Sequence, residues 1–89
     1  MNYQQFTDQG KSLIKPNKLS EAKFFFQKAL ELRPDFADAL TNLAIVEHKL
    51  GNLDQAVRLY KKVVALDFNY ALERENKILS VIYFFSQGN

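Results

Sequence analysis

The sequence predicts an all-α protein in which helices pair into hairpins and stack in order. Three observations carry this prediction. Residues 3–36 repeat as residues 37–70 at an offset of 34 residues. Apolar residues recur at the three- and four-residue spacing of a helix face, and no two segments have the pattern of paired strands. Pro, Gly and Asn separate the apolar segments, so that the expected helices are joined by short linkers.

The two copies share identical and similar residues along their whole length. A fixed period in this range indicates one supersecondary unit stacked on its own copy. The identical pairs are Thr7/Thr41, Lys15/Lys49, Leu19/Leu53, Ala22/Ala56, Lys28/Lys62 and Leu32/Leu66. The similar pairs are Phe6/Leu40, Gly10/Ala44, Asn17/Gly51, Phe25/Leu59, Phe26/Tyr60 and Phe36/Tyr70.

Two helices are expected in the first copy. The first spans roughly residues 3–15, with Phe6, Gly10 and Leu13 at helical spacing. Pro16 ends it, because proline lacks a backbone donor and disfavours the helical conformation of the residue before it. The second helix spans roughly residues 20–33 and ends at Pro34. Its buried side is expected to hold Ala22, Phe25, Phe26, Ala29, Leu30 and Leu32.

The second copy predicts a third helix over roughly residues 36–50, with Asp35 as its N-cap. Gly51 suits the left-handed residue that closes this helix, and Asn17 occupies the equivalent place in the first copy. A fourth helix over roughly residues 53–66 is expected to begin with a capping box formed by Asn52 and Gln55.

A fifth helix is expected to follow, with Asn69 as its cap and its end at about residue 86. Short linkers between amphipathic helices make consecutive helices antiparallel neighbours. The prediction is therefore five antiparallel stacked helices in one domain, residues 1–89.

The composition is that of an ordinary folded domain, with 47% hydrophobic and 25% charged residues. A net charge of +2 is too small to indicate a nucleic-acid or membrane partner. The chain has no cysteine, which excludes disulfides and thiolate metal sites. Neither a signal peptide nor a stretch of the roughly 20 apolar residues needed to span a membrane is visible. A cytoplasmic location is expected.

The repeat resembles the tetratricopeptide repeat (TPR) family, whose pattern includes Ala-x-x-x-aromatic and a later proline. The matching residues are Ala22, Phe26, Ala29 and Pro34 in the first copy, and Ala56 and Tyr60 in the second. The departures are Gln9 where leucine is usual, Glu47 where an aromatic is usual, and Phe68 where the second proline would fall. The resemblance implies an α-α superhelix, a right-handed solenoid of two hairpins (residues 3–36 and 37–70) closed by a capping or third-repeat helix (residues 71–86).

In this family the first helix of each hairpin lines a concave groove that holds a peptide or a partner helix. The resemblance therefore implies a protein-binding site formed by Lys11, Asp38, Thr41, Asn42, Ile45 and Lys49. Asn42 matches the asparagine with which family members commonly hold a peptide backbone. Three lysines (Lys11, Lys15 and Lys49) make a mildly basic strip, either attractive to an acidic peptide or merely solvated.

One narrower interpretation, binding of a C-terminal carboxylate, fails on the residues present. One subgroup of the family grips the C-terminal carboxylate of chaperone tails with five groove residues. The corresponding residues here are Thr7, Lys11, Asn42, Leu72 and Asn76, and only Asn42 agrees. A carboxylate needs converging cationic donors, so this reading is rejected.

An enzyme is not expected, because the sequence has no paired carboxylates in an apolar setting, no Gly-rich phosphate loop and a single histidine, His48. For the same reasons no metal and no cofactor is expected. Arginine occurs only at Arg33, Arg58 and Arg74, without clustering, so RNA binding is not favoured either.

The expected fifth helix carries apolar residues most of the way round, whereas a closing helix needs a polar outer face. Leu79, Tyr83 and Phe84 fall outside its main apolar stripe. Either they contact a second protomer or a partner helix, or the chain is a piece of a longer array, or the helix shifts its register. The sequence thus predicts a protein-binding module, with homo-oligomeric self-assembly through this helix as the alternative.

Overall fold

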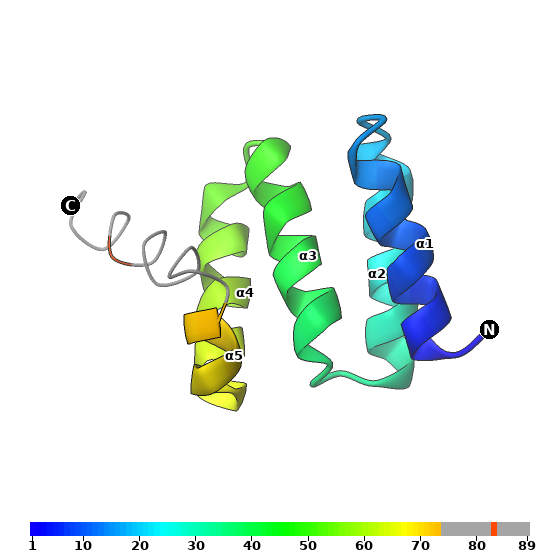
Figure 1. Ribbon diagram of the computed structural model, residues 1–89. Helices are drawn as coiled ribbons and strands as arrows, with labels where there is room; N and C mark the ends of the chain where they lie inside the picture. Colours follow the sequence, from blue (N-terminus) through cyan, green and yellow to red (C-terminus); the bar gives the residue numbers. More distant parts are fainter. Residues whose placement is uncertain (74–82, 84–89) are drawn as a thin grey trace.

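The computed structural model describes residues 1–73 and residue 83. Five helices follow in order: α1 (Tyr3–Ile14), α2 (Leu19–Leu32), α3 (Ala37–Lys49), α4 (Leu53–Leu66) and α5 (Phe68–Glu73). Consecutive helices run antiparallel, with α1, α3 and α5 toward the viewer and α2 and α4 behind them (Figure 1). No strand occurs in the described residues. The predicted all-α stack is confirmed; the continuation of the fifth helix to about residue 86 lies outside the described residues.

Close packing within the first hairpin depends on a glycine facing an aromatic ring. Phe26 on α2 is completely buried. A Cβ added to Gly10 on α1 would lie only 2.6 Å from a carbon of the Phe26 ring, so the two helices approach more closely than any larger residue allows. The repeat-equivalent residues Ala44 and Tyr60 are also buried. The rest of the buried cluster consists of Ala22, Leu40, Leu43, Val46, Ala56, Leu59 and Val63.

The turns inside the two hairpins have the same geometry. Asn17 has φ of 63° and Gly51 has φ of 88°, the left-handed conformation that the sequence predicts for both. In the first turn, the N–H of Lys18 donates to the carbonyl of Leu13 at 3.0 Å. In the second, the N–H of Asn52 donates to the carbonyl of Glu47 at 2.8 Å. This is the Schellman arrangement, in which a left-handed residue satisfies the last carbonyls of a helix.

The cap predicted for α3 is wrong, and the capping box predicted for α4 does not form. Phe36 is the N-cap of α3 and makes no side-chain cap bond. Asp35 instead lies with its carboxylate 3.4 Å from Arg33 Nε. Asn52 is the N-cap of α4 but forms no capping box, because its side-chain amide donates to Glu47 Oε1 at 3.1 Å. In both places the expected capping side chain binds another residue instead: Asp35 binds Arg33, and Asn52 binds Glu47.

The cap predicted for α5 is also wrong. In addition, the sequence analysis missed a capping box at the start of α1. Asp67, rather than Asn69, accepts the backbone N–H of Tyr70 at 2.9 Å. At the start of α1, Asn2 accepts the backbone N–H of Gln5, and the Gln5 side chain accepts the backbone N–H of Asn2. These reciprocal bonds satisfy two donors that a helix N-terminus leaves open.

The outer side of α1 is polar where the same side of α3 is apolar. Three buried residues of α3 are Ala39, Leu43 and Val46. Their equivalents on α1, which are exposed, are Gln5, Gln9 and Ser12. In α3 this side is covered by the first hairpin, while α1 has no described hairpin beyond it. Gln9, which stands where leucine is usual, belongs to this exposed polar side.

Candidate functional site

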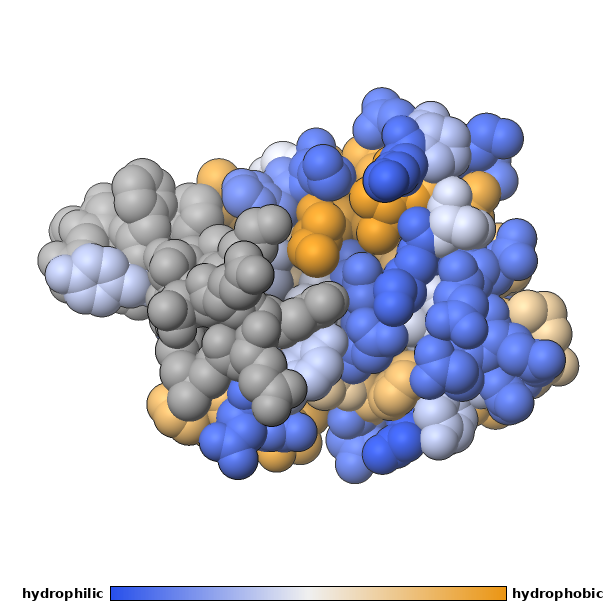
Figure 2. All heavy atoms as spheres, viewed as in Figure 1, coloured by the Kyte–Doolittle hydropathy of each residue, from blue (hydrophilic) through white to orange (hydrophobic). Residues whose placement is uncertain are grey.

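The family resemblance implies that a ligand would bind on the side formed by α1, α3 and α5, which is the side toward the viewer in Figure 1. The space-filling view shows that polar residues dominate this side over α1 and α3, with hydrophobic residues gathered toward the upper ends of these helices (Figure 2). We use the name α1–α3 face for the exposed and half-buried side chains of α1 and α3 on this side, among them Lys11, Lys15, Asp38, Ile45 and Lys49.

An ion pair joins the two helices of this face. Lys11 Nζ on α1 lies 3.2 Å from Asp38 Oδ2 on α3. The other carboxylate oxygen of Asp38 accepts a bond from Asn42 Nδ2 at 2.9 Å and lies 3.4 Å from the Tyr70 hydroxyl. Asp38 therefore connects α1, α3 and α5. Because Lys11 is paired, the strip of three lysines expected from the sequence is partly neutralised.

Two residues expected to bind a ligand lie beneath the face instead of on it. Asn42 is 5% exposed, and its amide donates both to the Asp38 backbone carbonyl at 2.8 Å and to the Asp38 carboxylate. Thr41 is 2% exposed, and its hydroxyl oxygen is buried without a hydrogen-bond partner. Neither side chain presents a donor at the surface. The sequence alone does not show this, because it cannot tell how far the first hairpin covers α3.

The remaining expected residues reach the surface. Ile45 is half-buried and packs against the core cluster with one side. Lys15 and Lys49 are exposed at the C-terminal ends of α1 and α3. Among the described residues, neither lysine forms an ion pair with a carboxylate. The face thus has an apolar side chain at Ile45 and two unpaired cations at one end.

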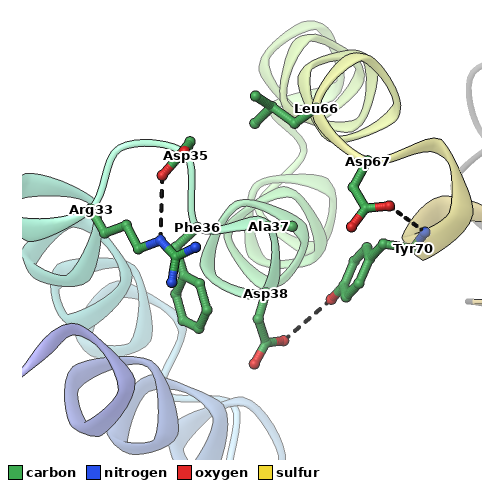
Figure 3. A pocket seen from close by; sticks show the side chains of 8 residues that line it. All are labelled: Arg33, Asp35, Phe36, Ala37, Asp38, Leu66, Asp67 and Tyr70. Atoms are coloured by element: carbon green, nitrogen blue, oxygen red, sulfur yellow. Dashed lines mark hydrogen bonds and ion pairs between the residues drawn. The ribbon is translucent and has the colours of Figure 1, made fainter.

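A pocket that the sequence analysis missed lies at the opposite ends of the helices from Lys15 and Lys49. Its volume is about 340 Å³, and it is formed by the turn between α2 and α3 together with the junction of α4 and α5. The lining residues are Arg33, Asp35, Phe36, Ala37, Asp38, Leu66, Asp67 and Tyr70 (Figure 3). Asp38 and Tyr70 point toward one another across its edge. The signal that could have found it is the replacement of Arg33 by Asp67 at the same repeat position.

Arg33 is held in a cluster with two aromatic rings beside this pocket. Its guanidinium carbon lies 5.0 Å from the centre of the Tyr3 ring and 5.2 Å from that of Phe36, and the two rings meet edge to face at 4.8 Å. Arg33 Nη1 donates to the Tyr3 hydroxyl at 2.9 Å. This hydrogen bond is the main cause that raises the pKa of Arg33 above its ordinary value. The guanidinium is therefore a fixed positive charge.

The C-terminal residues expected to form an oligomer contact are only partly described. Tyr83 is 67% exposed, whereas Leu79 and Phe84 lie outside the described residues. Across residues 1–73 and 83, no helix is long and apolar enough to cross a membrane. The same part of the chain contains no group of three or more His, Cys, Asp or Glu side chains arranged to hold a metal ion.

Comparison with known proteins identifies the family. A model of the tetratricopeptide repeat matches residues 13–73, more than half of the chain. An uncharacterized protein named ycf37, from Pyropia yezoensis, is 40% identical over 50 residues, which cover 56% of this chain and 28% of that protein. The chain therefore spans well under half of this relative. It belongs to the tetratricopeptide repeat family, whose members are generally protein–protein interaction modules and non-enzymatic scaffolds.

Proposed function

We propose that this protein binds an extended segment of a partner protein across the α1–α3 face. The observation that carries the proposal is the Lys11–Asp38 ion pair, which bridges α1 and α3 on one surface. Helices that already lie side by side before binding lose less conformational entropy when a ligand arrives. Membership of a family of protein-binding modules supports the same function.

Each surface residue has a distinct part in this proposal. Ile45 offers apolar contact to a side chain of the bound segment. Lys15 and Lys49 attract acidic residues at the end of the face where α1 and α3 finish. Asn42 acts indirectly, because its two bonds to Asp38 hold that carboxylate in place. A cytoplasmic location, consistent with a chain that has no cysteine, is part of the same proposal.

Selection from a displayed peptide library tests the proposal. Peptides selected on the wild-type chain should lose most of their affinity for a Lys15→Glu/Lys49→Glu variant. They should keep it for the matched variant Lys61→Glu/Lys62→Glu, which makes the same charge change at exposed positions of α4. Equal loss in both variants, or in neither, would contradict binding at the α1–α3 face.

Self-assembly is the second candidate function. One observation favours it: large apolar or aromatic side chains are exposed near the C-terminal end of the stack, with Leu66 45%, Phe68 54% and Tyr83 67% exposed. Exposed groups of this kind mark contact surfaces when they are contiguous. In this proposal Leu79, Tyr83 and Phe84 contact a second copy of the chain.

A further inference from the structure

The pocket lies where the second copy lacks the arginine and one of the two aromatic rings of the first copy. In the first copy, the Arg33 guanidinium lies over the rings of Tyr3 and Phe36, which are themselves in edge-to-face contact. At an offset of 34 residues, the equivalents of these three residues are Ala37, Asp67 and Tyr70. The ring of Tyr3 is thus replaced by a methyl group, and the guanidinium by a carboxylate. All three equivalents line the pocket, which opens at the place where the first copy holds its own arginine cluster.

Among the described residues, the charges around the pocket leave one carboxylate without a cationic partner. Asp35 is paired with Arg33 at 3.4 Å, and Asp38 with Lys11 at 3.2 Å. Asp67 accepts the backbone N–H of Tyr70 through Oδ1. No cationic side chain in the described part of the chain pairs with it. Within residues 1–73 and 83, the Asp67 carboxylate therefore has no cationic partner, and it lines the pocket together with the ring of Tyr70.

We propose that the pocket takes the side chain of an arginine from the segment that binds the α1–α3 face. The guanidinium would lie between the Asp67 carboxylate and the Tyr70 ring, and the alkyl stem would pack along Ala37 and Leu66. A planar guanidinium suits both neighbours, since it bonds a carboxylate through its edge and stacks on an aromatic ring through its face. The bound arginine would rebuild, in the second copy, the contacts that Arg33 makes in the first.

The two ends of the binding surface differ in charge, with the acidic pocket at one end and two lysines at the other. Asp67 lies at the junction of α4 and α5, near the end where α3 begins, while Lys15 and Lys49 lie where α1 and α3 finish. A segment with arginine at one end and acidic residues toward the other would match both ends. This specificity rests on the proposed function, and it predicts the orientation of the ligand along the face.

The direct test is an NMR titration of the full, isotope-labelled chain with Nα-acetyl-arginine methylamide. The matched neutral probe is Nα-acetyl-citrulline methylamide, which has nearly the same shape without the charge. The arginine probe should give saturable shifts at the backbone amides of Ala37, Asp67 and Tyr70, with a Kd in the millimolar range. Asp67→Asn, which keeps an oxygen to cap α5, should weaken binding about threefold or more. Asp54→Asn, at an exposed acid in the first turn of α4, should not.

Three results would overturn the pocket proposal: equal binding of both probes, shifts away from the pocket, or the same loss in both asparagine variants. A lysine probe that binds as tightly as the arginine probe would overturn the preference for guanidinium. The outcome is separable from that of the peptide selection. Selected peptides that bind the α1–α3 face without arginine refute the pocket proposal alone. A probe that binds the pocket while no peptide is selected refutes the peptide proposal alone.

Discussion

Glu47 on α3 and Lys23 on α2 form an ion pair, with 3.3 Å between Oε1 and Nζ. Glu47 is 4% exposed, and its carboxylate also accepts the side-chain amide of Asn52 at 3.1 Å. Both members of the pair are unusual at their positions. Glu47 stands where the family has an aromatic residue, and Lys23 stands where the other copy has Val57. The two departures compensate one another across the interface between the hairpins.

The stability losses from removing Lys23 and from removing Glu47 should therefore not be additive. Lys23→Met leaves the buried Glu47 carboxylate with the Asn52 amide but without its cation, and we expect a loss of about 1–2 kcal/mol of unfolding free energy. The double variant with Glu47→Met should lose less than the sum of the two single variants. Urea denaturation of all four proteins measures this coupling. Strictly additive losses would show that the pair contributes nothing.

A methyl group at Gly10 should destabilise the first hairpin. Alanine gains about 1 kcal/mol over glycine from helix propensity, but its Cβ would lie 2.6 Å from the Phe26 ring. The clash should outweigh the gain, so that Gly10→Ala loses about 1–3 kcal/mol. Thermal melting measures the change, with Ser12→Ala at an exposed site of α1 as the control. A more stable Gly10→Ala variant would contradict the close approach of α1 and α2.

The buried hydroxyl of Thr41 should be dispensable for stability. Thr41→Val keeps the shape of the side chain and removes a polar atom without a partner, so it should stabilise the fold by about 1 kcal/mol. Thr7→Val is the matched control, because the Thr7 hydroxyl donates to the Tyr3 carbonyl at 2.8 Å. Chemical denaturation should give a higher unfolding free energy for Thr41→Val than for Thr7→Val, which loses a hydrogen bond. A destabilised Thr41→Val beside an unchanged Thr7→Val would reverse the interpretation.

Self-assembly through the C-terminal residues makes a separate prediction. If Leu79, Tyr83 and Phe84 contact a second copy, the wild-type chain should associate as its concentration rises, and Phe84→Glu should abolish this association because it places a charge in an apolar interface. Sedimentation velocity over a dilution series measures it, with Leu32→Glu, at a 57% exposed leucine of α2, as the control. A monomeric wild type would end the self-assembly proposal.

The repeat predicted the helices and their pairing because these depend on periodic residues such as Ala22, Phe26 and Tyr60, which pack within each unit. Details that depend on competition between neighbours were not predictable in the same way. Asp35 has the chemistry of a cap, yet Arg33 holds its carboxylate. The burial of Asn42 depends on how the helices pack against α3, which the sequence of α3 alone does not encode.

The pocket was missed for a related reason. Its lining residues come from two turns that the repeat brings to the same end of the stack, and single-position motifs do not reveal such a meeting. The comparison that does reveal it is between copies: Tyr3 becomes Ala37, and Arg33 becomes Asp67. The pocket lies at positions where the two copies differ, whereas the core is built from positions where they agree.

Mapping a selected peptide on the isotope-labelled chain by NMR tests the binding claim most directly. A spin label on the peptide should broaden the amide signals of α1 and α3 around Lys15, Ile45 and Lys49, and leave those of α2 and α4 largely unaffected. Broadening concentrated on α2 and α4 would contradict the claim.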